Sequence, residues 1–158
     1  MTDFETITVD QHRAVATITL RRPAANFYAL DLESALLDET LPLVQQIAKC
    51  PRPVICAVNG LAAGAGANLA LACDIVIAAH SASFLQANVL AGMIPDTGGT
   101  YFLPRRVGVA RAMALSLTGD AVSAEQAADW GLIWKAVADD DLMEEANALA
   151  DRLAKGPA

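Results

Sequence analysis

The chain has 158 residues and a formal net charge of −7, with no basic tract. This length is typical of one domain, so we expect a single domain over residues 1–158. The acidic charge argues against a nucleic-acid partner. A chain of this size buries roughly 70% of its unfolded surface, so its fold requires neither a disulfide nor a metal. Its three cysteines lack CxxC spacing, and no His/Cys/Asp cluster has metal-ligand spacing, so we expect free thiols and no metal.

Polar and apolar residues alternate at the start of the chain. This pattern predicts strands over residues 5–9 and 14–20, joined by a turn at residues 10–13. Apolar residues at helical spacing predict a helix over 31–50, which Pro42 interrupts. The following elements are a buried strand, a helix of small residues, a second buried strand and a further short strand, over residues 52–60, 64–73, 74–79 and 82–89.

The second half begins with residues 91–108, which are expected to form a loop that leads into a short helix. An amphipathic helix over 109–119 follows, and Gly119 stops it. Ser123 and Gln126 form the pattern of a capping box, in a helix that ends at Gly131. A strand over 132–137 and a helix over 139–156 complete the chain. Because strands and helices alternate, the predicted class is α/β.

The apolar run over residues 54–79 is long enough to span a bilayer. It contains Asn59, Asn68 and Asp74 and has no basic flank, and an Asp near the bilayer centre costs roughly 3 kcal/mol. We therefore expect no membrane partner. The first ten residues are polar and acidic, unlike a signal peptide, which favours a cytoplasmic protein.

A glycine-rich turn joins the buried strand to the helix of small residues, in "VNGLAAGAGANLALACD". Gly60, Gly64 and Gly66 allow positive φ or the close approach of a ligand. The first amides of the helix have no intrahelical partner, so they can bind an anion or a polarised carbonyl oxygen. The alternative is that these small residues serve packing alone. The glycine spacing differs from the dinucleotide-binding G-x-G-x-x-G.

Two segments carry a resemblance to a known family: "PRPVICAVNGLAAGAGANLALACDIVIAAHSASF" and "GMIPDTGGTYFLPRRVGVARAMALSLTGDAVSAEQAADWGLIWKAV". They resemble the crotonase (enoyl-CoA hydratase/isomerase) superfamily from about residue 51 to residue 155. The resemblance implies a crotonase-like (ClpP/crotonase) core of stacked β-strands with surrounding helices. Within the family, "NGLAAGAGANLALACD" and "IPDTGGTYFLPR" are most similar to members that isomerise a ring-1,2-epoxyphenylacetyl-CoA in phenylacetate catabolism.

The resemblance implies an acyl-CoA thioester as substrate, with coenzyme A as part of that substrate and no separate cofactor. Members of the family hold the thioester oxygen between two backbone amides. One of these positions falls on Ala65, flanked by Gly64 and Gly66, and its N–H would stabilise an enolate-like intermediate. Losing such a donor typically raises a barrier by about 3–4 kcal/mol. The family also implies a homo-oligomer, either a trimer or a hexamer.

The acid/base group decides which reaction the family resemblance implies. The two glutamates of hydratases match Asn68 and Asn88, and an amide cannot take up and return a proton, which argues against hydration. Both asparagines are expected to line the substrate pocket. Isomerases place a carboxylate in the loop after "GMIP", which is Asp96 here, beside the substrate-binding residues Ile94 and Pro95. One carboxylate can move a proton between two carbons of an acyl chain.

Several alternatives stay open at Asp96. Its side chain can instead cap the following helix, or attack an aromatic ring as the nucleophile of related aryl-CoA dehalogenases. As a base, it is expected to be surrounded by apolar side chains, namely Met93, Ile94, Tyr101 and Phe102. Other polar residues have surface positions or lack a catalytic partner: His12, His80, Ser116 and Ser123. Arg105 and Arg106 can contact CoA phosphates or lie in solvent.

The sequence departs from the family pattern in two places. A segment with a turn resembling "FSAGADL", which supplies the other amide and part of the CoA pocket, is missing between about residues 23 and 31. The C-terminal helices of the family are also absent. Either this sequence is part of a longer chain or it is a short form, and a short form would be a catalytically inactive binding or assembly protein.

Overall fold

The computed structural model describes residues 2–3, 7–12, 15–20 and 41–155. The strands are β1 (Thr2–Asp3), β2 (Ile7–His12), β3 (Val15–Leu20), β4 (Val54–Val58), β5 (Leu61–Ala63), β6 (Ile75–Ala79), β7 (Ser83–Leu85), β8 (Val122–Ser123) and β9 (Lys135–Val137). The helices are α2 (Leu41–Ala48), α3 (Ala65–Ala72), α4 (Gly99–Thr118), α5 (Ala124–Asp129) and α6 (Leu142–Ala154), with short 3-10 helices η2 (Ala87–Ala91) and η3 (Asp139–Asp141).

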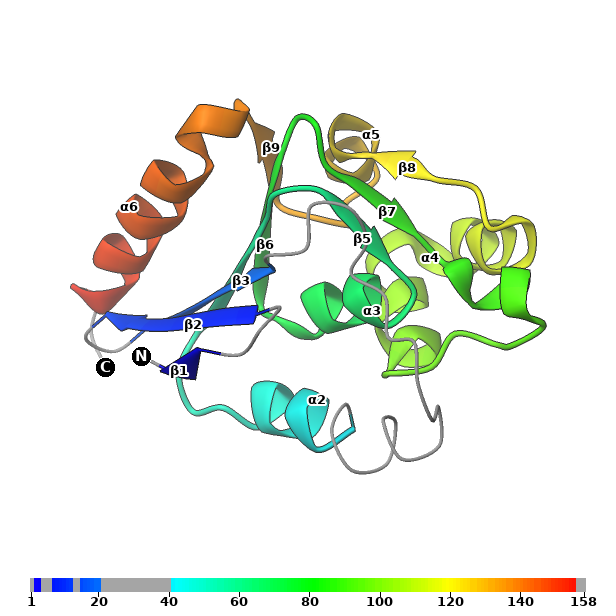
Figure 1. Ribbon diagram of the computed structural model, residues 1–158, viewed down its shortest axis with the longest axis horizontal. Helices are drawn as coiled ribbons and strands as arrows, with labels where there is room; N and C mark the ends of the chain where they lie inside the picture. The colour runs from blue at the N-terminus through cyan, green and yellow to red at the C-terminus, as the bar shows by residue number, and fades with distance from the viewer. Residues whose placement is uncertain (1, 4–6, 13–14, 21–40, 156–158) are drawn as a thin grey trace.

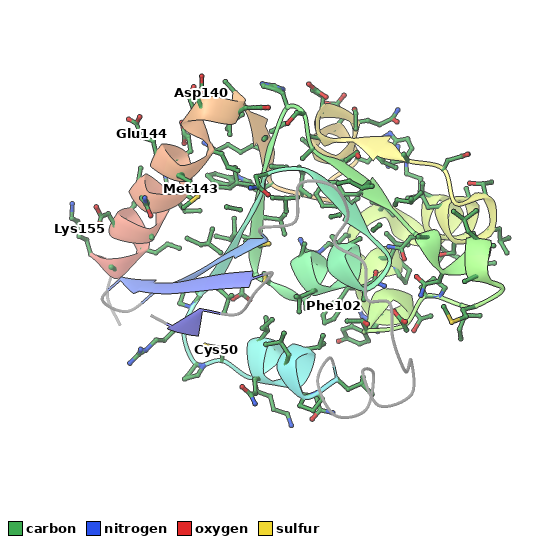
Figure 2. The ribbon with its side chains drawn as sticks, in the orientation of Figure 1. Cys50, Phe102, Asp140, Met143, Glu144 and Lys155 are labelled. Carbon is green, nitrogen blue, oxygen red and sulfur yellow. The ribbon has the colours of Figure 1, made fainter. Side chains whose placement is uncertain are left out.

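Two sheets organise these elements (Figure 1). The larger has the order β1-β2-β3-β4-β6-β9, in which β1 to β3 are antiparallel and β3, β4, β6 and β9 run parallel. The smaller has the order β5-β7-β8. Helix α6 packs on β3, β4 and β6, with Glu144 and Lys155 on its outer side (Figure 2). The alternation of strands and helices confirms the predicted α/β class.

Parallel strands covered on both faces should be apolar along their whole length. Strand β4 follows this rule, because all five of its residues are buried, and β6 buries four of five. Helix α3 is buried all round as well: seven of its eight residues are buried, among β5, α2 and α4. Packing therefore explains most of the small residues in this helix, since small side chains let it approach its neighbours closely.

The structure corrects several predicted boundaries. Strand β2 continues to His12, which pairs with Val15, so the predicted turn at residues 10–13 began too early. The strand predicted over 52–60 ends at Val58, and a separate strand, β5, follows it. Leu132 and Ile133 were assigned to a strand, but their N–H groups both donate to Ala127 O at the end of α5. Strand β9 therefore covers only Lys135–Val137.

The strand predicted over 82–89 is shorter than expected, because β7 ends at Leu85 and Asn88 and Val89 lie in η2. Of the remaining predicted features, some are confirmed and some lie outside the described residues. Helix α2 covers the last part of the helix predicted over 31–50, with Pro42 in its first turn, where proline is tolerated; residues 31–40 are not described. Ser123 Oγ caps α5 by accepting a hydrogen bond from Gln126 N. The residues of the apolar run form β4, β5, α3 and β6, and none of the helices in the described parts of the chain could cross a membrane.

Helix α4 contains a break. Gly108 has φ 79° and ψ 161°, which is not helical, so the two halves of α4 meet at an angle there. The first half begins at Gly99 and corresponds to the short helix expected at the end of residues 91–108. The second half leaves Val109, Met113 and Leu117 more than half exposed.

Two exposed carboxylates lie near the carboxyl end of β6. His80 Nδ1 is 2.7 Å from Glu125 Oε1, and Ser81 N donates to Asp139 Oδ1 at 3.1 Å. Hydrogen bonds from its own main chain and from His80 lower the pKa of Glu125. The hydrogen bonds from Ser81 lower the pKa of Asp139. His80 is a surface residue, as expected.

Candidate active site

The start of α3 presents unpaired main-chain amides. Gly64 precedes the helix with φ 52° and ψ −117°, a conformation that favours glycine, and its N–H donates to Leu85 O at 2.8 Å. The first bond inside the helix runs from Asn68 N to Gly64 O at 3.0 Å. The amides of Ala65, Gly66 and Ala67 therefore have no partner four residues earlier in the helix. This geometry suits the binding of a negatively charged or polarised oxygen.

Asn68 lies one helical turn after Ala65 and is fully buried. Its Nδ2 donates to Asp96 O at 3.0 Å, and its Oδ1 accepts from Gln86 Nε2 at 2.9 Å. The amide is thus occupied on both sides by the protein itself. The structure places Asn68 inside the fold rather than on the wall of a pocket, contrary to the expectation that it lines the substrate site.

The loop that carries Asp96 has an unusual backbone. Thr97 has φ 50°, and among the described residues it is the one non-glycine with positive φ. Gly98 follows with φ 80°, and a Cβ there would lie 2.6 Å from Phe102 Cε2. A Cβ on Gly99 would lie 2.5–2.6 Å from three side-chain atoms of Asn68. The glycines of "DTGG" are therefore required by backbone conformation and by space.

The carboxylate of Asp96 is half-buried, and its Oδ1 accepts a hydrogen bond from Thr97 Oγ1 at 3.0 Å. The residue that caps α4 is Gly98, with no side-chain capping bond, so the N-cap alternative for Asp96 is wrong. The expected apolar surround is also incomplete. Ile94 is 77% exposed and Tyr101 is 55% exposed, whereas Pro95 is buried.

Two buried amide oxygens in this region lack a partner. Asn88 Oδ1 and Gln86 Oε1 accept no hydrogen bond from the described residues, although both side chains are 95% buried. Asn88 lies at the start of α3, because a Cβ on Gly64 would be 3.5 Å from its Oδ1. Buried acceptor atoms of this kind normally have a hydrogen-bond partner. Asn88 therefore places an unpartnered acceptor beside the helix start.

Several of the predicted residues lie around the start of α3. Gly64, Ala65 and Gly66 form the helix start, Asn88 lies beside it, and Asn68 connects the same helix to Asp96. The sequence did not single out Gln86, Thr97 or Gly99. The positions of Gln86, two residues before Asn88, and of Thr97, next to Asp96, were the available signals. Among the described residues, no group of three or more His, Cys, Asp or Glu could hold a metal ion.

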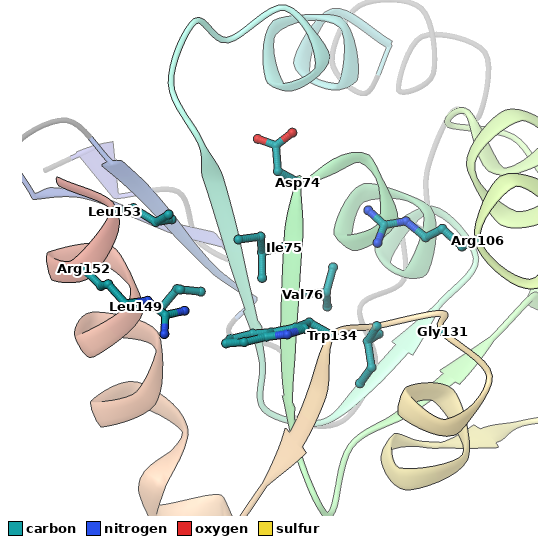
Figure 3. A pocket seen from close by; sticks show the side chains of 10 residues that line it. Asp74, Ile75, Val76, Arg106, Gly131, Trp134, Leu149, Arg152 and Leu153 are labelled. Carbon is teal, nitrogen blue, oxygen red and sulfur yellow. The ribbon is translucent and has the colours of Figure 1, made fainter. Parts of the chain in front are cut away.

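A pocket of about 400 Å³ lies near the other end of α3 (Figure 3). Its lining includes Asp74, Trp134, Arg152 and Arg106. Arg106 is one of the two arginines considered for contact with CoA phosphates, and the lining holds none of the residues predicted at the start of α3 or in the Asp96 loop. The guanidinium of Arg106 donates to three main-chain oxygens, those of Leu71, Cys73 and Leu132. Burial lowers the pKa of Arg106. Arg106 thus donates hydrogen bonds to carbonyl oxygens at the C-terminal end of α3. Arg105, in contrast, stacks on the ring of Tyr101 at the surface.

Comparisons with known proteins agree with this architecture. The profile of the enoyl-CoA hydratase/isomerase family matches residues 29–158. A probable enoyl-CoA hydratase of Rhodobacter capsulatus is 56% identical over 81% of this chain and 50% of its own length. The 1,2-epoxyphenylacetyl-CoA isomerase of Escherichia coli is 60% identical over 73% of this chain and 44% of its own length. The chain thus spans about half the length of these curated relatives.

Solved structures share the fold. An enoyl-CoA hydratase from Mycobacterium avium subsp. paratuberculosis superposes with a TM-score of 0.83 at 28% identity, over 100% of this chain and 82% of that one. An enoyl-CoA hydratase from Bacillus anthracis gives 0.80 at 30% identity, over 96% and 78%. On sequence and fold together, the chain belongs to the enoyl-CoA hydratase/isomerase family of the crotonase superfamily.

Proposed function

We propose that this chain carries the catalytic residues of an acyl-CoA isomerase, with Asp96 as its acid/base and the Ala65 N–H as a thioester-oxygen donor. The observation that carries the proposal is the Asn68–Asp96 hydrogen bond, which joins the loop of the carboxylate to the helix of the free amides. The two positions that matched hydratase glutamates are amides here, so the carboxylate of Asp96 remains as the group that can exchange a proton.

The proposed reaction needs one carboxylate and one oxygen-binding amide. Asp96 removes a proton from a carbon beside the thioester carbonyl, and the electron pair moves onto the carbonyl oxygen. The Ala65 N–H stabilises that enolate oxygen. Asp96 then returns the proton at another carbon, so no atom is gained or lost. The likeness to the epoxyphenylacetyl-CoA isomerase supports a ring-1,2-epoxyphenylacetyl-CoA-like thioester as the substrate.

Asp96→Asn tests the acid/base role. We expect kcat for isomerisation of 1,2-epoxyphenylacetyl-CoA to fall by about 10²–10⁴-fold, while calorimetry shows unchanged CoA binding. Undiminished turnover would refute the role. Hydration of a 2-enoyl-CoA serves as the counter-assay, because water addition faster than isomerisation would favour a hydratase. A wild-type chain that binds no acyl-CoA would favour the inactive binding or assembly protein.

Ala65→Pro tests the amide, because proline removes the N–H at the first helical position, where proline is well tolerated. We expect a loss in kcat of about 10²–10³-fold. Ala65→Ser is the matched control, since it changes the side chain and keeps the N–H. Equal turnover by the Pro and Ser variants would exclude this amide from the oxygen-binding site.

A further inference from the structure

Asn68 lies between the two proposed catalytic positions, and its amide is used entirely within the protein. We propose that Asn68 is a positioning residue, which fixes the main chain at Asp96 relative to the start of α3, with Gln86 fixing Asn68 in turn. This inference rests on the proposed function, because it assumes that Asp96 is the acid/base. It assigns Asn68 a role other than contact with substrate.

The hydrogen bonds give Asn68 a single orientation. Asp96 O can only accept, so the NH2 group of Asn68 must be the side that faces it, at 3.0 Å, and Oδ1 is left to accept from Gln86 Nε2 at 2.9 Å. Asp96 O also accepts from Gly99 N at 2.6 Å, and these two donors fill both lone pairs of that carbonyl. Since Asn68 is fully buried and Gln86 nearly so, water does not compete for these bonds.

The loop requires such an anchor because its backbone is strained. A β-branched residue at positive φ, as at Thr97, costs about 1–3 kcal/mol and persists only where surrounding contacts hold it. The Asn68 bond fixes the residue before Thr97, and the absence of a side chain on Gly99 provides the space for the Asn68 amide. Thr97 Oγ1 in turn orients the Asp96 carboxylate.

An amide is the side chain that this position requires. Its nitrogen donates to a carbonyl on one side, while its oxygen accepts from an amide on the other. A carboxylate of the same shape has no donor for Asp96 O, and it would place a negative charge against that carbonyl oxygen. Asn68→Asp is therefore a nearly isosteric change that removes the anchor and alters the charge at once.

The test compares Asn68→Asp with Asn147→Asp, which adds the same charge on the exposed face of α6. For Asn68→Asp we expect kcat to fall by about 10²-fold with KM little changed, because the carboxylate is displaced. The acid limb of the pH–rate profile should move to higher pH, because the variant carries a second acidic side chain next to the main chain of residue 96. Asn147→Asp should leave kcat, KM and the pH–rate profile unchanged.

The double variant Asn68→Asp/Asp96→Asn separates the possible outcomes. Turnover equal to that of Asp96→Asn alone supports action through Asp96, whereas a further fall of similar size would overturn it. If Asp96→Asn is inactive but Asn68→Asp keeps the wild-type kcat and pH profile, the positioning role is wrong and the proposed function stands. If Asp96→Asn keeps full turnover, the proposed function is wrong, and the positioning role that rests on it is wrong as well.

Gln86→Met provides a second variant in case Asn68→Asp does not fold. It removes the donor to Asn68 Oδ1 and introduces no charge, so Asn68 loses one of the two hydrogen bonds that hold its side chain. We expect a smaller fall in kcat than for Asn68→Asp, at unchanged KM and with no shift of the pH profile. Wild-type kcat in Gln86→Met would then overturn the positioning role.

Discussion

In the variant Gly99→Ala, helix propensity and side-chain packing have opposite effects on stability. Gly99 is the first residue of α4 and has no positive φ, so an Ala there adopts the native backbone. Propensity alone would favour Ala by up to about 1 kcal/mol. The structure predicts the opposite sign, because the new Cβ would lie 2.5–2.6 Å from three atoms of the Asn68 amide.

The size of the expected loss in stability follows from the displacement of the Asn68 side chain. Extra methyl groups in a packed interior typically cost about 1–3 kcal/mol. Displacing Asn68 also weakens its bonds to Asp96 and Gln86, at about 0.5–1.5 kcal/mol each. After allowing for propensity, we expect Gly99→Ala to lower the free energy of unfolding by about 1–5 kcal/mol. Urea denaturation measures this as a lower midpoint at constant slope.

Two variants serve as controls for this prediction. At Gly92 an added Cβ would meet nothing within 4 Å, so Gly92→Ala should cost only the strain of its φ of 69°, about 1–2 kcal/mol. In the Asn68→Ala background the obstacle is gone, so Gly99→Ala should cost much less there than in the wild type. A Gly99→Ala chain as stable as the wild type would refute the steric argument.

The remaining predictions concern charge and thiols. Because Glu125 and Asp139 have lowered pKa values in the folded chain, the stability they contribute is present above the usual carboxylate range and is lost as pH falls through the folded values. Glu125→Gln and Asp139→Asn should flatten the acid side of the stability–pH curve, and equally steep curves would contradict this. In native protein, a thiol reagent should modify half-buried Cys50 first, whereas buried Cys56 and Cys73 should react only after unfolding. A hydrogen bond with Cys56, together with burial, raises the pKa of Cys73, which slows its reaction further, so fast labelling of Cys73 would count against the packing described.

Local sequence pattern was sufficient for the frame of the fold. The apolar run before Asn59 predicted β4, and the Ser123–Gln126 spacing predicted the cap of α5. Strand β5 was missed because it has only three residues, too few for a periodic pattern, and it pairs with β7 some twenty residues later. Its existence depends on that partner rather than on its own composition.

The candidate site was also predictable only in part, because some of its contacts join residues that are distant in sequence. The helix start at Ala65 and the carboxylate at Asp96 stand out in the sequence and in its family resemblance. The place of Asn68 does not, because its partners Gln86 and Asp96 are 18 and 28 residues away. Nothing near Asn68 in the sequence distinguishes a buried amide with two partners from one that faces a ligand.

The contact between Asn68 and residue 96 has an evolutionary consequence. Asn68 binds a main-chain oxygen, an atom that every amino acid possesses, so the contact is independent of the side chain at position 96. Mutation can exchange that side chain while the scaffold keeps its shape. A single codon change at position 96 can therefore introduce a different reactive side chain, while the hydrogen bond from Asn68 to the main chain is kept.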